Sequence, residues 1–105
     1  MDPRIERLEA VIKARKGADP SSSYVASLFA KGTAKIAQKV GEEATETIIA
    51  ALHEGPEKLT SEAADLLFHL SILLADAGLS MDDVLSELER REGVSGIEEK
   101  ASRKG

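Results

Sequence analysis

Five carboxylates lie in two short segments of the 105-residue chain, at spacings that suit helices. The first segment holds Glu42, Glu43 and Glu46, and the second holds Glu62 and Asp65. A helix turns by about 100° per residue, so Glu42 and Glu46 share one face and Glu43 lies roughly 60° to one side of Glu46. Clustered carboxylates repel one another unless a cation lies among them. Because all five offer only oxygen, the pattern favours a Mg²⁺ site, with Mn²⁺ as a substitute.

The first segment also fits an ordinary solvated helix face. Lys39 precedes Glu43 by four residues, a spacing at which opposite charges pair on exposed helices. Glu43, however, lies between this charged face and an apolar stripe on the same helical wheel. The stripe centres on Val40, Ala44, Thr47 and Ala51. We therefore expect the Glu43 carboxylate to be partly buried, and the segment by itself leaves both interpretations open.

The second segment favours the metal site. Residues 66–75 are almost entirely apolar, which predicts a helix buried on most sides. No Lys or Arg occurs between Lys58 and Arg90, so we expect this helix to offer its carboxylates no cation of its own. Buried carboxylates are rare unless they are paired or bind metal. The polar residues Glu62, Asp65, His69 and Asp76 share one sector roughly 60° wide on the wheel.

The charge balance agrees with a cation-binding cluster. The chain carries 19 Asp and Glu against 14 Lys and Arg, a formal net charge of −5. With the five clustered carboxylates set aside, 14 acidic residues face 14 basic ones. The acidic excess therefore equals the cluster in size.

Glycine-containing breaks divide the chain into about five predicted helices. The alternation of apolar and polar residues that is typical of strands is absent. We expect Thr33 to cap the third helix, and Ser80 with Asp83 to form a capping box for the fifth. The predicted helices cover residues 3–16, 23–31, 33–54, 57–77 and 81–91.

The predicted fold class is therefore all-α, a helical bundle of about five helices. Aromatic residues make up only 3% of the chain, so its core must be aliphatic. A chain this short buries roughly 60–68% of its unfolded surface, so we expect dimerisation to complete the bundle. Residues 1–92 are predicted to form one domain. Residues 93–105, with three glycines and mixed charge, are predicted to form a flexible C-terminal tail.

The composition indicates where the protein acts and which kinds of partner it can bind. No apolar run reaches 18 residues and the first residues lack an apolar signal segment, so we expect no membrane association. The absence of cysteine excludes disulfides and thiolate metal sites and is compatible with the cytoplasm, where we expect the protein to act. An acidic chain without a basic cluster argues against nucleic acid as a partner. It does not argue against a phosphate ligand, because bound Mg²⁺ can supply the positive charge.

The acidic motif resembles that of a known superfamily. Its spacing is similar to the signature of the all-α nucleotide pyrophosphohydrolases, which include the MazG-type enzymes and the dimeric dUTPases. Over about residues 5–92 the chain resembles the phosphoribosyl-ATP pyrophosphohydrolase family. The segments that carry this resemblance are Ser23-Tyr24-Val25 through Lys31-Gly32, then Lys35-Ile36-x-x-Lys39-Val40-Gly41-Glu42-Glu43-Ala44-x-Glu46, and finally Glu62-Ala63-Ala64-Asp65-Leu66-Leu67-x-His69-Leu70.

The resemblance implies a reaction, a cofactor and an assembly. The reaction is hydrolysis of phosphoribosyl-ATP, a small nucleotide, to phosphoribosyl-AMP and pyrophosphate, which is the second step of histidine biosynthesis. The implied cofactor is Mg²⁺, and the implied assembly is a homodimer. A metal ion can screen phosphoryl oxygens and lower the pKa of bound water, which suits attack on a triphosphate. We expect the metal ligands to be Glu42, Glu43, Glu46, Glu62 and Asp65, with Glu43 either a ligand or the catalytic base.

Four further residues are candidates for substrate binding. Lys35 and Lys39 lie one and two turns before Glu42 and could contact phosphates, although a solvated surface pair fits nearly as well. Lys31 and Tyr24 are weaker candidates, Tyr24 on family likeness alone. His69 could support a ligand carboxylate, but the more frequent role of such a histidine is that of a hydrogen-bonded core residue.

Three alternatives remain open at this stage. A MazG-type housecleaning dNTP pyrophosphatase would use the same acidic cluster with a different pocket for base and ribose. A carboxylate-bridged di-iron bundle uses Glu-x-x-His, and that motif does not occur in the chain. A purely structural helical bundle would show neither metal dependence nor triphosphate turnover.

Overall fold

The computed structural model describes residues 2–93, and within this range it contains helices and no strand. The all-α prediction is therefore confirmed, whereas the predicted tail beyond Gly93 lies outside the described residues. No single described helix is long and apolar enough to cross a membrane; only α4 and α5 together reach that length and composition, bent by 99°. The helices are α1 (Pro3–Arg15), α2 (Tyr24–Lys31), α3 (Thr33–His53), α4 (Pro56–Asp76) and α5 (Met81–Arg90).

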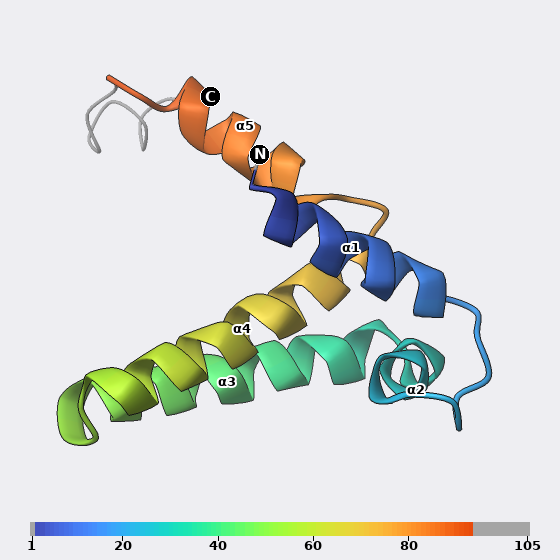
Figure 1. Ribbon diagram of the computed structural model, residues 1–105, viewed down its shortest axis with the longest axis horizontal. Helices are drawn as coiled ribbons and strands as arrows, with labels where there is room; N and C mark the ends of the chain where they lie inside the picture. The colour runs from blue at the N-terminus through green and yellow to red at the C-terminus, as the bar shows by residue number, and fades with distance from the viewer. Residues whose placement is uncertain (1, 94–105) are drawn as a thin grey trace.

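A hairpin of α3 and α4 dominates the fold. The two helices lie side by side along their length, and the short turn between them is at one end of the molecule (Figure 1). Gly55 makes the turn possible, because its φ of 90° lies in the left-handed region that favours glycine. Pro56 then begins α4, a position where its missing N–H has no cost. The hairpin brings the two acidic segments of the sequence together.

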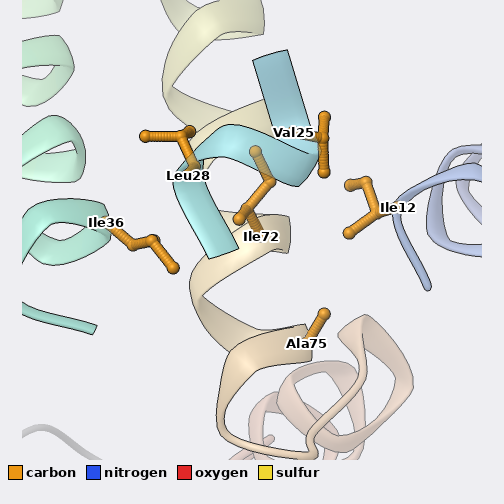
Figure 2. Close-up of a cluster of buried hydrophobic side chains, with 6 residues drawn as sticks. All are labelled: Ile12, Val25, Leu28, Ile36, Ile72 and Ala75. Atoms are coloured by element: carbon orange, nitrogen blue, oxygen red, sulfur yellow. The ribbon is translucent and has the colours of Figure 1, made fainter. Parts of the chain in front are cut away.

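The hydrophobic core lies at the other end of this hairpin. There α1 and α2 pack against the beginning of α3 and the end of α4, and their aliphatic side chains converge (Figure 2). Ile36 and Ile72 are completely inaccessible to solvent. The remaining members of the buried cluster are Ile12, Val25, Leu28 and Ala75.

The cap predictions have mixed outcomes. Ser80 and Asp83 form the expected reciprocal capping box at the start of α5. The prediction for Thr33 is wrong, because Gly32, with φ of 95°, is the residue that joins α2 to α3 and takes the cap position. Thr33 is instead the first helical residue, and its hydroxyl donates to the Asp76 carboxylate. This hydrogen bond ties the start of α3 to the end of α4.

The buried face of α3 is rotated relative to its predicted stripe. Its buried residues are Ile36, Glu43 and Ala50, whereas Ala51 is exposed. Glu43 therefore lies within the buried face and not beside it. Towards the turn the apolar side chains lose their cover within residues 2–93, since no other helix reaches this end of the hairpin (Figure 1). Ile48, Ile49 and Leu52 are exposed in the last turns of α3, and Leu67 is exposed near the middle of α4.

We predict that Ile72→Ala will destabilise the protein strongly. The side chain is fully buried among α1, α2 and α3, so its truncation leaves a cavity and should lower the free energy of unfolding by about 2–5 kcal/mol. Val11→Ala is the control, because Val11 is 53% exposed and its truncation should change stability by no more than about 0.5 kcal/mol. Urea unfolding of both variants measures the difference, and equal effects would contradict this placement of the core.

Candidate active site

Three carboxylates from the two hairpin helices meet midway along the hairpin. Glu43 comes from α3, and Glu62 and Asp65 lie one turn apart on α4. One oxygen from each lies within 4.8 Å of the others, a separation that suits shared coordination of one cation. The structure thus gathers three of the five carboxylates that the sequence singled out.

Two of these carboxylates are buried and incompletely satisfied. Only 8% of Glu43 and 7% of Glu62 is exposed to solvent, whereas Asp65 is exposed. The Oε2 atoms of Glu43 and Glu62 are buried and have no hydrogen-bond partner. A buried charged oxygen without a donor is costly, and a bound cation removes that cost. The donor set contains only oxygen, which suits Mg²⁺ or Mn²⁺.

Glu62 also has a basic neighbour that the sequence analysis overlooked. Lys58 Nζ lies 3.4 Å from Glu62 Oε1, one turn earlier on α4. The expectation that this helix offers its carboxylates no cation of its own is therefore wrong. The i,i+4 spacing of the two residues was a signal that could have revealed the pair. Lys58 satisfies one oxygen of Glu62 and leaves the other without a partner.

The other two predicted metal ligands lie outside the three-carboxylate cluster. Glu42 is exposed, accepts a hydrogen bond from Gln38 at 2.9 Å and pairs with Lys39 at 3.2 Å. These hydrogen bonds, that of Gln38 first, lower the pKa of Glu42. Glu46 is exposed and lines a hollow of about 270 Å³ between α3 and α4. Ile49, Glu54, Lys58 and Glu62 also line this hollow.

The predicted substrate-binding lysines lie at different distances from the cluster. The hydrogen bond to Glu42 raises the pKa of Lys39 and keeps its ammonium charged. Lys35, one turn earlier, contributes to the lowered pKa of Glu42 through its charge. Lys31 lies exposed in the last turn of α2. Lys39 is therefore the one of these three lysines with a direct contact to an acidic residue of the motif.

Tyr24 and His69 form a polar link between α2 and α4 beside the cluster. The Tyr24 hydroxyl lies 2.7 Å from Nε2 of His69, and Nδ1 of His69 lies 2.8 Å from the backbone oxygen of Asp65. His69 is 5% exposed, which agrees with a hydrogen-bonded buried histidine. The ring of Phe68 packs near both. No spacing in the sequence predicts this contact, because 45 residues separate its partners.

The electrostatics of Tyr24 reflect its position next to the carboxylates. Burial of the hydroxyl is the main cause that raises the pKa of Tyr24. The positive charge of Lys39 opposes this shift, and the negative charges of Glu43 and Asp65 add to it. The phenol therefore remains protonated at neutral pH, between a lysine and the acidic cluster.

Curated proteins match the chain over nearly its whole length. Relatives named phosphoribosyl-ATP pyrophosphatase include one from Rhizorhabdus wittichii, 61% identical over 103 residues that make up 98% of this chain and 97% of the relative. Another, from Erythrobacter litoralis, is 63% identical over 94% of this chain and 95% of its own. A third, from Zymomonas mobilis, is 64% identical over 91% of this chain and 90% of its own.

A family model describes the same region. The model for phosphoribosyl-ATP pyrophosphohydrolase matches residues 5–92, which include all of α2, α3, α4 and α5. The matched region contains the three clustered carboxylates as well as Tyr24 and His69. On its sequence, its all-helical structure and these relatives, the chain belongs to the phosphoribosyl-ATP pyrophosphohydrolase family.

Proposed function

We propose that this protein hydrolyses phosphoribosyl-ATP to phosphoribosyl-AMP and pyrophosphate, a step of histidine biosynthesis, in the cytoplasm. Its membership of the family and the names of its relatives support the substrate. The observation that carries the chemistry is the pair of buried carboxylates, Glu43 and Glu62, each with an oxygen that has no partner. Buried polar atoms without a partner are rare in folded proteins, and a bound ion or a catalytic role is a common reason for them.

The three clustered carboxylates fit a divalent cation. We propose that Glu43, Glu62 and Asp65 hold Mg²⁺, with Mn²⁺ as a substitute, and that Glu42 and Glu46 join them when substrate is bound. When bound, the cation screens the charge of the phosphoryl oxygens and makes a coordinated water more acidic. The free Oε2 of Glu43 has a lone pair with no donor, which also makes it a candidate to accept a proton from the attacking water.

Basic side chains flank the carboxylates on two sides. Lys58 lines the hollow that also contains Glu46, so its ammonium is placed to meet an anionic group that enters there. Lys39 lies on the other side of the carboxylates, where it pairs with Glu42 and its charge acts on Tyr24. We propose that these lysines contact the phosphates as point charges, with Lys35 and Lys31 as further candidates. The leaving pyrophosphate then departs with its charge partly balanced.

We also propose that the protein acts as a homodimer. The exposed apolar residues of the hairpin, Ile48, Ile49, Leu52 and Leu67, form the surface that a second copy would cover. Ile49 also lines the hollow together with Glu46 and Glu62, so a partner on this surface would cover the hollow. The radius of gyration, 15.9 Å, exceeds the roughly 13 Å of a compact chain of this length, as expected for an open half of a larger bundle.

The activity prediction uses pyrophosphate release as its measurement. With Mg²⁺ we expect turnover of phosphoribosyl-ATP well above that of a panel of dNTPs, and none with excess EDTA. Glu43→Gln and Asp65→Asn should each lower kcat by at least about 100-fold, because changing even the outer partners of metal ligands costs about 10–100-fold. Glu57→Gln, an exposed carboxylate on the same helix as Asp65, should keep full activity.

Two results would contradict this assignment. Preference for a dNTP over phosphoribosyl-ATP would favour the MazG-type housecleaning activity. An Asp65→Asn protein with unchanged kcat would remove the role of the three-carboxylate cluster.

A second prediction concerns metal binding and stability. A ligand that binds only the folded state at a hundred times its Kd stabilises it by about 2.7 kcal/mol. At about 4–8 °C per kcal/mol for a domain of this size, Mg²⁺ should raise the Tm by roughly 10–20 °C. Glu43→Gln should lose this response and melt above wild type in EDTA, because it removes an unpaired buried charge. If neither Mg²⁺ nor Mn²⁺ changes the Tm, the protein has no preformed metal site.

A third prediction tests the assembly. Leu52 is 71% exposed, so Leu52→Lys should cost an isolated chain little stability but should disrupt a dimer that buries this residue. Sedimentation velocity at micromolar concentration should show wild type as a dimer and Leu52→Lys as a monomer. Val11→Lys, an exposed position on α1, should leave the dimer intact. A fully active wild-type monomer would rule out the proposed assembly.

A further inference from the structure

The hydrogen bonds of His69 fix the direction of its contact with Tyr24. The backbone oxygen of Asp65 has only lone pairs, so Nδ1 of His69 must carry the hydrogen of their 2.8 Å bond. In a neutral imidazole the other nitrogen then has no hydrogen and accepts. With a neutral His69, the Tyr24 hydroxyl therefore donates in its 2.7 Å contact with Nε2. The tautomer of His69 thus determines whether the Tyr24 oxygen donates or accepts hydrogen bonds.

With its single hydrogen committed, the Tyr24 oxygen offers only lone pairs to any other group. It can accept a hydrogen bond but cannot give one. Phosphate oxygens at neutral pH are acceptors as well, so this oxygen has no favourable hydrogen bond to make with the triphosphate. A group that meets the Tyr24 oxygen must carry an O–H or N–H.

The position of Tyr24 narrows the choice of that donor. Tyr24 is 49% exposed, so its ring can contact a ligand. The charges of Lys39, Glu43 and Asp65 act on its hydroxyl, which therefore lies close to the acidic cluster. In the substrate the ribose follows the α-phosphate directly, whereas the base lies beyond it. When the carboxylates hold the triphosphate, the donors of the substrate nearest to the phosphates are therefore on this ribose. The hydroxyls of that ribose are hydrogen-bond donors.

We propose that Tyr24 orients the substrate by accepting a hydrogen bond from a hydroxyl of the ribose that carries the triphosphate. His69 is the positioning residue that makes this oxygen an acceptor, and its bond to the Asp65 backbone links the contact to the acidic cluster. This inference rests on the proposed function and adds a determinant of specificity for ribose over deoxyribose. It gives α2 a part in substrate selection.

The tautomer can be measured without any turnover. The chain has two histidines, so nitrogen NMR of protein with ¹⁵N-labelled histidine gives two ring spectra, and His53→Gln assigns them. At a pH where the imidazoles are neutral, we expect His69 to show a protonated Nδ1 and an unprotonated Nε2. In Tyr24→Phe the Nε2 signal should shift, because its donor is gone. The opposite tautomer in wild type would overturn the proposal.

Kinetics test the ribose contact itself. The substrates are phosphoribosyl-ATP and its 2′-deoxy and 3′-deoxy forms, with the missing hydroxyl on the ribose that carries the triphosphate. Wild type should lose about fivefold in kcat/KM with one of the deoxy forms, the equivalent of one neutral hydrogen bond worth about 1 kcal/mol. Tyr24→Phe keeps the ring beside Phe68 but should treat all three substrates alike. Undiminished discrimination in Tyr24→Phe would overturn the proposal.

A double-mutant cycle separates the role of His69 from a structural one. His69→Gln should also reduce discrimination between the ribose and deoxyribose substrates, and combining it with Tyr24→Phe should reduce that discrimination no further. If the two substitutions reduce the ratio of kcat/KM between the ribose and deoxyribose substrates additively, His69 does not act through Tyr24. If His69→Gln fails to fold, the tautomer measurement on wild type still decides. Wild type without turnover on any nucleotide would instead overturn the proposed function.

Discussion

The burial of Glu43 and Glu62 between α3 and α4 is the constraint on which the rest of this structure depends. Each carboxylate has an oxygen that no donor satisfies, and an unsatisfied buried polar group costs about 1–3 kcal/mol, more when it is charged. Lys58 offsets part of that cost for Glu62 from the edge of the hollow. The hairpin can tolerate this arrangement only because other contacts hold its two helices together.

Those other contacts are concentrated at the far end of the hairpin. Ile36 on α3 and Ile72 on α4 are fully buried there, where α1 and α2 pack over them (Figure 2). The hydrogen bond from Thr33 to Asp76 closes the same end. The aliphatic core thus stabilises the fold at one end, and the part of the hairpin with the carboxylates is left open for a ligand or a second copy. The proposed site thus lies in the part of the hairpin that the other described helices leave uncovered.

Much of the fold was accessible from the sequence because it rests on local rules. Glycines at positive φ, such as Gly32 and Gly55, separate the helices. Residues with a Cβ rarely adopt this backbone conformation, so glycine marks these breaks in the sequence. The box of Ser80 and Asp83 is likewise a contact between residues three apart. The predicted cap at Thr33 was wrong, because two helices share one connecting residue and Gly32 takes that place.

The sequence by itself determined the helices, the acidic motif and the family, because spacing along one helix and similarity to relatives need no knowledge of the fold. It could not rank the five acidic residues of the motif. Only the packing of α3 against α4 decided that Glu43, Glu62 and Asp65 converge. Glu42 remains outside this cluster and pairs within α3 with Gln38 and Lys39. The link from Tyr24 to His69 was likewise decided by tertiary structure, since it joins residues far apart in the chain. A helical wheel gives the direction of a side chain on its own helix, but burial and hydrogen bonding depend on which neighbouring helix lies there.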